Sequence, residues 1–564
     1  MSKLISTAKE QIKTALESAI KNAQAENKFP QAQIPEYTIE VPADKANGDF
    51  AANIAMVCAR AFRSAPRMIA QEIVSRVSCE GTYFERVAVA GPGFINFYLN
   101  QSFYTDVLVD IDRKKGSYGR SDFGRGQKIM VEFVSANPTG PMHIGNARGG
   151  ALGDCLASVL DYAGYDVTRE FYINDAGNQI EKFAVSLEAR YLQIYLGENA
   201  VPFPEDAYHG EDIRKLAYDF AKINGADYVK AEQKDRRRAL VDFALPLNIK
   251  GLQTDLARYN INFDVWFNES RLHRNGELDQ TIDLMCKRGL TYEKEGALWY
   301  KATEYGGEKD EVLIRANGLP TYFAVDIAYH RNKFMIRQFD RVINVWGADH
   351  HGHVARLKGA MDAIGLDGGR LRIVLMQMVR LIKDGQAVKI SKRTGKAITL
   401  NTLLDEVPAD AARFVFNSRE TGTHLEFDLD LAVEQSAKNP VYYVQYAHAR
   451  ICSVIGNLAA DGVSCEGYSA DDLACLTSPE ELDLIRQLSR LEDEIIAAAD
   501  ACEPARMTRY AIDTAALFHK FYNACRVKGE ELPVMKARLL VCQATGTVLK
   551  NVLELMKISA PESM

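Results

Sequence analysis

Hydrophobic and polar positions follow different periods along the chain. Between residues 113 and 435, short apolar runs alternate with segments in which apolar residues recur every three or four positions. The apolar runs predict strands at 129–134, 167–173, 342–346 and 373–376. Alternating strands and helices are typical of a Rossmann-like parallel sheet. From about 190 to 300 a charged, largely helical segment interrupts the pattern, which predicts an insertion between the two halves of the sheet.

The regions on either side have patterns of their own. Residues 1–112 show helical spacing over roughly 1–25, a second helix start at 48–55 and strands at 87–90 and 94–99, so we expect an N-terminal α/β domain. From 436 to 564 the strand pattern disappears and apolar residues recur at helical intervals, which predicts an all-α bundle. The expected fold class is therefore α/β with two appended domains.

Composition narrows the class of protein. The chain has 564 residues, enough for several domains, of which 47% are hydrophobic and 25% charged. No apolar run is long enough to cross a bilayer and the first residues lack the apolar core of a signal peptide, so we expect a cytoplasmic protein without a membrane partner. The ten cysteines contain no C-x-x-C pair, which argues against a zinc ribbon. A net charge of −7 argues against indiscriminate nucleic-acid binding but permits a local basic surface.

The first candidate for chemistry is the sequence VEFVSANPTGPMHIGN, residues 131–146. It runs from a predicted strand through a turn to a predicted helix start, where free backbone N–H groups carry partial positive charge. Gly145 lets a nucleotide lie against this turn, and His143 can donate a hydrogen bond to a phosphate oxygen. A βα turn in which proline and glycine only set the geometry explains this segment equally well.

The second candidate is KDGQAVKISKRTGK, residues 383–396, which places four lysines and one arginine in a predicted loop bounded by glycines. Such a loop can close over a triphosphate and neutralise the leaving pyrophosphate. The alternative is a solvated charged hairpin.

Together, the two segments resemble the paired signatures of class I aminoacyl-tRNA synthetases. His143-Ile144-Gly145-Asn146 corresponds to the HIGH tetrapeptide, and Lys389-Ile390-Ser391-Lys392-Arg393 to the KMSKS loop, in the same chain order. Asn146 replaces the second histidine of the first signature. Its amide can still donate a hydrogen bond, but it cannot provide an imidazolium contact.

The amino-acid specificity depends on a different segment. Tyr322 and Asp326 lie four residues apart in NGLPTYFAVDIAYH (317–330), which places them on one face of a short predicted helix. A carboxylate beside a phenol suits a planar guanidinium. Glu132 and Asn137 flank the histidine signature and could hold the substrate's α-ammonium group or further donors of the substrate. A surface or capping role for Asp326 is the alternative.

Over essentially its full length, the sequence is similar to bacterial arginyl-tRNA synthetases. Besides the signatures, this resemblance rests on the segments 172–179, 346–353 and 443–450. It implies catalytic roles for His143, Asn146, Lys389 and Lys392. It implies an arginine site lined by Glu132, Ser135, Asn137, Gln179, Tyr322 and Asp326. It also implies ATP contacts at Pro141, His143, Gly145, Asn146, Gly347, Asp349, His350, His353, Met378, Val379, Lys389, Ser391 and Lys392, with magnesium accompanying the nucleotide. The three histidines at 350, 351 and 353 could place at most two side chains together, so no zinc site is expected.

The same resemblance implies an arginine tRNA as partner. The N-terminal domain would contact the tRNA elbow and the bundle would bind the anticodon, since it mixes aromatic and cationic residues as base stacking requires. The candidate contacts are Phe50, Asn53, Tyr443, Tyr446, His448, Arg450, His519, Tyr522 and Arg526. The basic run KDRRR (234–238) either meets the tRNA acceptor end or forms a solvated helix face.

The resemblance thus implies ligation of arginine to tRNA through an arginyl-adenylate, with adenylation awaiting bound tRNA. We expect the enzyme to act as a monomer. Three alternatives stay open on the residues alone. They are a class I synthetase for another amino acid, an adenylyltransferase with a related histidine signature, and a non-catalytic RNA-binding paralogue.

Overall fold

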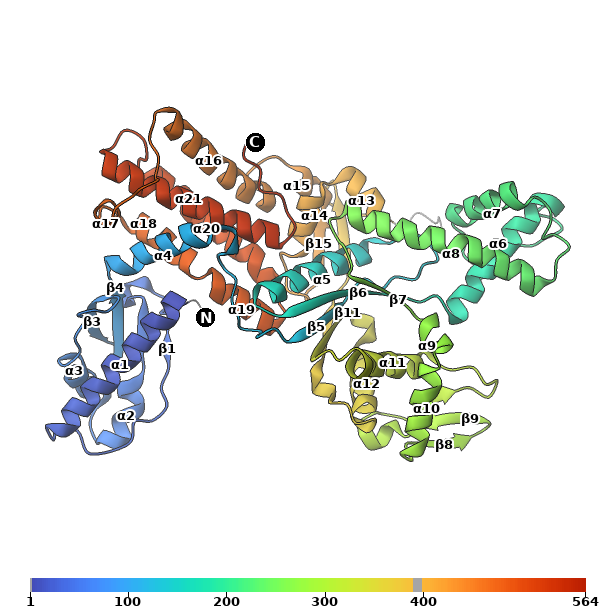
Figure 1. The fold of residues 1–564 in the computed structure, drawn as a ribbon, viewed down its shortest axis with the longest axis horizontal. Helices are drawn as coiled ribbons and strands as arrows, with labels where there is room; N and C mark the ends of the chain where they lie inside the picture. Colours follow the sequence, from blue (N-terminus) through green and yellow to red (C-terminus); the bar gives the residue numbers. More distant parts are fainter. Residues whose placement is uncertain (1–2, 389–397) are drawn as a thin grey trace.

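The computed structural model describes residues 3–388 and 398–564 (Figure 1). At one end of the molecule, a four-stranded antiparallel sheet in the order β1-β2-β4-β3 forms the N-terminal domain. Its strands are β1 (Ile39–Glu40), β2 (Phe50–Ala52), β3 (Phe84–Ala90) and β4 (Phe94–Leu99), and its helices are α1 (Lys3–Ala25), α2 (Ile54–Phe62) and α3 (Pro66–Val74). This confirms the predicted α/β character of the region.

One detail of this domain was predicted wrongly. Residues 50–52 were expected to begin a helix, but they pair with β4 as a fully buried strand, and α2 begins only at Ile54. Phe50, Ala51 and Ala52 are all apolar, so their spacing fits a buried strand as well as a helix start.

The central sheet has five parallel strands in the order β12-β11-β5-β6-β7. They are β5 (Lys128–Glu132), β6 (Asp166–Ile173), β7 (Val265–Asn268), β11 (Arg341–Gly347) and β12 (Leu371–Met376), and four of them confirm the predicted strands. The chain leaves β5 through α5 (Ile144–Tyr162) to β6 on one side, whereas β11 lies on the other side. The carboxyl ends of β5 and β11 therefore form a topological switch point, the place where such sheets bind ligands.

The predicted insertion proves to be two separate units. Helices α6 (Gly177–Leu196), α7 (Glu211–Asn224) and α8 (Gln233–Arg258) pack around their own core, which includes Phe183, Tyr191 and Phe220. The chain then rejoins the central sheet at β7, which lies inside the range assigned to the insertion. Beyond it follow α9 (Ser270–Arg274), α10 (Glu277–Lys287) and a second, antiparallel sheet of β8 (Thr291–Lys294), β9 (Ala297–Tyr300) and β10 (Glu311–Ile314).

Further helices and a small sheet complete the central part of the chain. Helix α11 (Tyr322–Arg331) precedes β11, and α12 (His351–Ala363) follows it. The small sheet has the order β14-β13-β15, with β13 (Val379–Lys383), β14 (Gln386–Ala387) and β15 (Leu425–Asp428). Helices α13 (Leu400–Glu406), α14 (Ala409–Phe416) and α15 (Leu429–Val433) surround it, and α4 (Gln101–Lys114) connects the N-terminal domain to this region.

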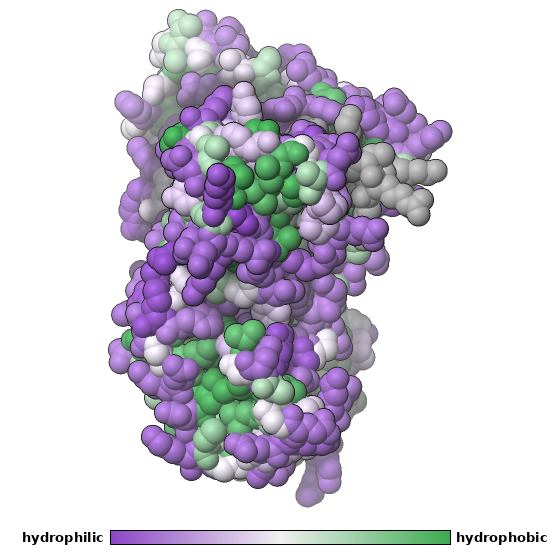
Figure 2. Space-filling view, turned by 90° about the vertical axis from the view of Figure 1, so that its right-hand side faces the viewer, coloured by the Kyte–Doolittle hydropathy of each residue, from purple (hydrophilic) through white to green (hydrophobic). Residues whose placement is uncertain are grey.

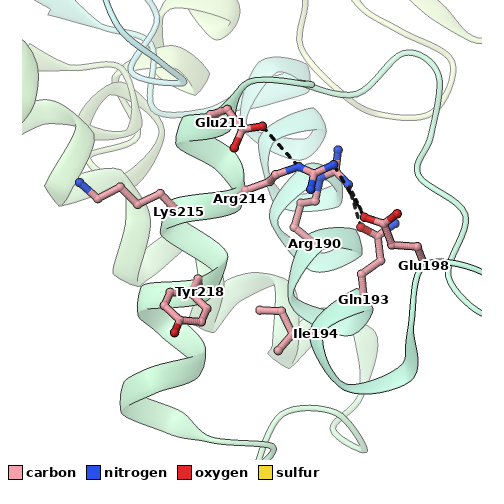
Figure 3. A pocket seen from close by; sticks show the side chains of 8 residues that line it. All are labelled: Arg190, Gln193, Ile194, Glu198, Glu211, Arg214, Lys215 and Tyr218. Atoms are coloured by element: carbon pink, nitrogen blue, oxygen red, sulfur yellow. Dashed lines mark hydrogen bonds and ion pairs between the residues drawn. The ribbon is translucent and has the colours of Figure 1, made fainter.

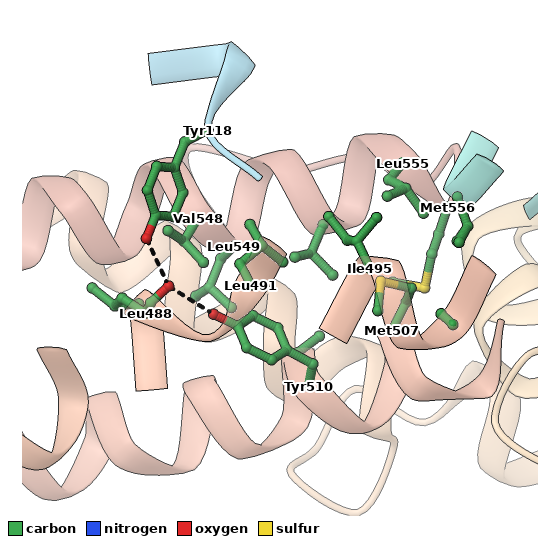
Figure 4. Close-up of a cluster of buried hydrophobic side chains, with 14 of the residues drawn as sticks. Tyr118, Leu488, Leu491, Ile495, Met507, Tyr510, Val548, Leu549, Leu555 and Met556 are labelled. Atoms are coloured by element: carbon green, nitrogen blue, oxygen red, sulfur yellow. Dashed lines mark hydrogen bonds between the residues drawn. The ribbon is translucent and has the colours of Figure 1, made fainter. Parts of the chain in front are cut away.

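The C-terminal region is entirely helical, as predicted. It contains α16 (Pro440–Ala460), α17 (Ala470–Leu473), α18 (Pro479–Ser489), α19 (Leu491–Ala501), α20 (Ala505–Ala524) and α21 (Leu532–Leu555). In its core, the hydroxyls of Tyr118 and Tyr510 both donate to the carbonyl of Leu488, so a linker residue preceding β5 is fixed to the bundle (Figure 4). None of the helices in the described residues has the length and apolar character needed to cross a membrane.

Candidate active site

The turn between β5 and α5 forms the centre of the candidate site. Directly after β5, Val134 and Ser135 adopt positive φ angles of 67° and 41°, which side chains rarely tolerate. Such conformations cost of order 1–3 kcal/mol each and often occur at functional sites. Close packing of α5 holds the turn in place, because a Cβ atom at Gly153 would lie 2.2 Å from the ring of Phe133. Glycine is therefore required there.

His143 is the N-cap residue of α5. Its Nδ1 accepts a hydrogen bond from the backbone N–H of Gly145 at 3.1 Å, and Asn146 Oδ1 accepts one from the backbone N–H of His143 at 3.2 Å. This reciprocal arrangement is a capping box. Desolvation lowers the pKa of His143, so the ring is neutral near pH 7. Since Nδ1 accepts, Nε2 carries the proton and is the atom that can donate to a ligand.

Residues 398–400 pair with the turn at His143. The backbone N–H of Ile144 donates to the carbonyl of Ile398 at 3.2 Å, and that of Leu400 donates to the carbonyl of Met142 at 2.9 Å. Lys389, Ser391 and Lys392 lie outside the described residues. The segment that contains them nevertheless ends in backbone pairing with the histidine turn, and its other end follows the β13–β14 hairpin.

Helix α11 presents the predicted guanidinium site. Tyr322 is 46% exposed and lies one turn before Asp326, whose Oδ2 accepts from His353 Nε2 at 2.7 Å. His353 Nδ1 in turn accepts from Arg356 Nε at 2.7 Å, which fixes the proton on Nε2. His353, predicted to contact ATP, orients Asp326 through this hydrogen bond.

Sequence reasoning missed a second carboxylate in this site, Glu269. It directly follows β7, is only 3% exposed, and accepts a hydrogen bond from the hydroxyl of Tyr172 at 2.9 Å. Burial, together with the negative charges of Asp326 and Asp175, raises the pKa of Glu269 to about 7. Asp175 accepts from Asn268 and from Ser270, so it ties the start of the α6–α8 insertion to the end of β7. A bound cation would relieve the repulsion between these carboxylates.

Glu132 is buried and already has a cationic partner. Lys333 donates to its Oε2, and Ser135 donates to its Oε1 at 3.1 Å. Lys333 is fully buried because a π-helix, Asn332–Ile336, follows α11 and turns this side chain inward, where its Nζ also donates to Asn344 at 3.2 Å. Any ligand of Glu132 therefore meets a pre-neutralised carboxylate.

The other predicted ligand contacts lie around the switch point. Asn137, Pro141 and Asp349 are exposed, Gly347 ends β11, and Met378 is 77% exposed at the start of β13. His350 packs its ring against Trp346, with centroids 5.8 Å apart. Gln179 accepts a hydrogen bond from Tyr208 on the insertion.

The predicted RNA contacts separate into exposed and buried residues. On α16 and α20, Tyr446 stacks on His519 with ring centroids 6.1 Å apart, and the Arg450 guanidinium lies 4.4 Å from the ring of Tyr522. Tyr443 also packs against His519, and Arg526 is exposed. These residues form an aromatic and cationic surface on the bundle.

Four features predicted to contact RNA make structural contacts within the protein. Phe50 is 4% exposed and packs edge-on against Phe84, and His448 is 5% exposed with Nδ1 against the carbonyl of Pro561. Asn53 Oδ1 accepts from the backbone of Thr38. In the basic run, Arg236 and Arg237 both bind Glu188, so little of their charge is left for RNA.

The insertion carries a groove of about 540 Å³ between α6 and α7 (Figure 3). Its cations face its own carboxylates, since Arg190 and Arg214 share Glu198 at 3.8 and 3.7 Å and Arg214 also lies near Glu211. Seen from this end, the molecule is mostly hydrophilic with separate apolar patches (Figure 2). Most of the positive charge in the groove is thus compensated by its own carboxylates, which weakens its attraction for an RNA backbone.

A parallel sheet with a histidine-capped helix at its switch point is the arrangement of a class I aminoacyl-tRNA synthetase. Three family models divide the chain between them. They are the arginyl tRNA synthetase N terminal domain over residues 9–99, the tRNA synthetases class I (R) catalytic domain over 108–456 and the DALR anticodon binding domain over 444–564.

Full-length relatives agree with these models. The arginine–tRNA ligase of Acetivibrio thermocellus is 53% identical over 564 residues and that of Caldanaerobacter subterraneus 55%, each covering 100% of both chains. The fold matches the Thermus thermophilus arginyl-tRNA synthetase with a TM-score of 0.73 and 23% identity, covering 98% of this chain and 100% of that one. The chain belongs to the arginyl-tRNA synthetase family. It ligates L-arginine to its tRNA with ATP as the energy source for protein synthesis.

Proposed function

We propose that Glu269, Asp326 and Tyr322 hold the guanidinium of arginine. The observation that carries this assignment is a buried carboxylate whose pKa is raised to about 7 partly by a second carboxylate, beside the carboxyl ends of β6 and β7. Two neighbouring carboxylates repel each other unless a cation lies between them, and a planar guanidinium can donate to both. A larger or uncharged amino acid would leave both carboxylates unpaired, so this pair sets the specificity.

The substrate's α-ammonium group then lies toward Glu132, Ser135 and Asn137. Because Lys333 already neutralises Glu132, recognition there is by oriented hydrogen bonds rather than by net charge. Gln179, on α6 of the insertion, lines the same side of the arginine site.

ATP, entering with magnesium as part of the substrate, occupies the other side of the switch point. The first turn of α5 and His143 Nε2 face the phosphates, Gly347 and Asp349 the ribose, and the backbone of 378–379 the adenine. Pro141, Gly145 and His350 would line this space, and Asn146 acts by holding the cap. The arginine carboxylate attacks the α-phosphate, and Lys389, Ser391 and Lys392 stabilise the leaving pyrophosphate.

The terminal ribose of the tRNA then takes the arginyl group from the adenylate. Tyr443, Tyr446, Arg450, His519, Tyr522 and Arg526 contact unpaired anticodon bases, which stack on aromatic and guanidinium planes. The protein acts as a monomer in the cytoplasm.

The test of these assignments is the exchange of labelled pyrophosphate into ATP. It is measured with each of the twenty amino acids in turn, with and without tRNA. We expect exchange with arginine and with no other amino acid. Asp326→Ala should abolish this exchange at ordinary arginine concentrations, and high arginine concentrations should restore it. Exchange with another amino acid, or an Asp326→Ala variant with equal losses for ATP and arginine, contradicts the guanidinium site.

A further inference from the structure

Arg148, the fifth residue of α5, makes an unusual set of contacts. Its side chain is fully buried, and its guanidinium donates four hydrogen bonds, all to backbone carbonyls. Nη1 donates to Gln377 at 2.6 Å and to Thr423 at 3.1 Å, and Nη2 donates to Thr423 at 3.1 Å and to Glu420 at 3.2 Å. Its Nε lacks any partner in the described part of the chain.

Stability alone does not account for this arrangement. Burial lowers the pKa of Arg148 to about 10, so the side chain is still charged at neutral pH. Among the described residues no carboxylate forms an ion pair with it, and a buried charge without a counter-ion costs several kcal/mol before its hydrogen bonds are counted. An apolar side chain of similar size would avoid the buried charge but would leave these carbonyls without this donor, so the guanidinium serves the carbonyls that it binds.

Those carbonyls belong to the two chain segments that enter the small sheet. Gln377 connects β12 to β13, and residues 420–423 lead into β15. The two segments also bind each other, since the N–H of Gln377 donates to the carbonyl of Thr421 at 3.0 Å and Val379 pairs with Leu425. Met378, the next residue after Gln377, begins the exposed backbone that we assign to adenine.

We propose that Arg148 is a positioning residue that fixes the adenine-contacting backbone at 378–379 relative to the phosphate-facing turn at His143. Both ends of ATP are then held by one helix, His143 at its first turn and Arg148 one turn further on. The guanidinium end of the arginine site is built instead from α11 and the end of β7, whereas the four hydrogen bonds of Arg148 go to residues 377, 420 and 423. Loss of the Arg148 hydrogen bonds should therefore raise the KM for ATP and leave the KM for arginine unchanged. This inference rests on the proposed assignment of 378–379 to ATP.

The informative variant is Arg148→Lys, which keeps the charge but cannot reach carbonyls on two segments with one planar fork. The chain provides a matched control in Arg413, which is also fully buried and also binds α5, through Asp154 at 2.6 Å, with further bonds to the carbonyls of Met556 and Tyr259. Arg413 has no bond to residues 377–379. Arg413→Lys therefore reports the cost of disturbing a buried arginine on this helix without moving the adenine backbone.

Pyrophosphate exchange with tRNA present, run beside thermal unfolding, separates the two roles. We expect Arg148→Lys to raise the KM for ATP about tenfold, to leave the KM for arginine within twofold, and to weaken the preference for ATP over GTP. Arg413→Lys should lower the Tm by about as much as Arg148→Lys does, but it should leave both KM values and the preference for ATP over GTP unchanged. Equal rises for ATP and arginine, or a lower Tm with unchanged KM for ATP, would overturn the proposal.

A second variant covers the case in which Arg148→Lys does not fold. Thr423 is exposed, and both its N–H and its Oγ1 donate to the carbonyl of Glu420, at 3.1 and 2.8 Å, which holds two of the acceptors in place. Thr423→Val should raise the KM for ATP about threefold with arginine unaffected. No change in the KM for ATP in this variant would also overturn the proposal. Failure of the unmodified enzyme to exchange pyrophosphate at all would refute the proposed function instead.

Discussion

Arginine binding should weaken as the pH falls through about 7, because the guanidinium site contains a carboxyl group that titrates there. The perturbation is a change of pH from 8 to 6, with Glu269→Gln as the reference enzyme. Free Glu269 has a pKa raised to about 7, mainly by burial. A bound guanidinium stabilises the ionised form, so the complex keeps Glu269 deprotonated and binding must expel the proton at low pH.

The magnitude follows from the titration. With a pKa of about 7, the ionised fraction is roughly 0.9 at pH 8 and roughly 0.1 at pH 6. If only the ionised form binds, the KM for arginine rises about tenfold between these values, which corresponds to about 1.4 kcal/mol. The amide that Glu269→Gln introduces can accept from Tyr172 as the carboxylate does, but it has no charge. Glu269→Gln should therefore bind arginine weakly at both pH values, with little dependence on pH.

The folding stability of the enzyme should depend on pH in the opposite direction to arginine binding. The carboxyl is ionised in the unfolded chain above about pH 4.3, whereas in the folded chain it stays protonated up to about 7. Folding stability is therefore lost as the pH rises between these values, by about 4 kcal/mol in total. Glu269→Gln removes this loss, so the variant should have a higher Tm than the unmodified enzyme at pH 8 and a similar one at pH 5.

The assay is the KM for arginine in pyrophosphate exchange with tRNA, from pH 6 to 8, with the KM for ATP measured on the same samples. A flat profile for arginine in the unmodified enzyme would refute the assignment of Glu269. So would a profile that Glu269→Gln reproduces, since the titrating group would then lie elsewhere.

Three further predictions concern other parts of the site. Lys392→Ala should slow single-turnover adenylation by orders of magnitude at saturating ATP, while Lys396→Ala has a mild effect and melting curves stay the same; equal small effects would make the segment a solvated loop. Lys333→Met should lower the free energy of unfolding by about 3–5 kcal/mol, because it leaves Glu132 charged and buried, and adding Glu132→Gln should restore most of it in urea titrations. Tyr446→Ala should raise the KM for tRNA in aminoacylation, by about 1–3 kcal/mol of lost stacking, while leaving the KM for arginine unchanged; unaffected tRNA binding would exclude this surface.

The sequence predicted the parts of the site that depend on local order. The strand, turn and helix around His143 follow one another directly in the chain, and Tyr322 and Asp326 share a face of α11 because of their spacing alone. Glu269 escaped notice since β7 is only four residues long and lies within a stretch dominated by helical periodicity. Its place in the site depends on pairing with β6, a contact over more than ninety residues.

The inward turn of Lys333 was also beyond prediction, because a π-helix has no clear sequence signal. Phe50 and His448 show that residue type alone does not predict whether a ring is exposed. Composition indicates that a ring is available for stacking, but only packing decides whether the ring faces RNA or the core.

The hydrogen bonds that Asp175 accepts from Asn268 and Ser270 have a mechanical consequence for the insertion. The insertion leaves the sheet just after Asp175 and returns through β7, and Asp175 holds the two exits together through Asn268 and Ser270. Helix α8 is held separately, where Asn248 donates to the carbonyl of Pro138 and Arg258 to that of Leu404. A displacement of the start of α6 therefore acts directly on residues 268–270, which include Glu269, so the insertion and the guanidinium site are connected through one short peptide segment.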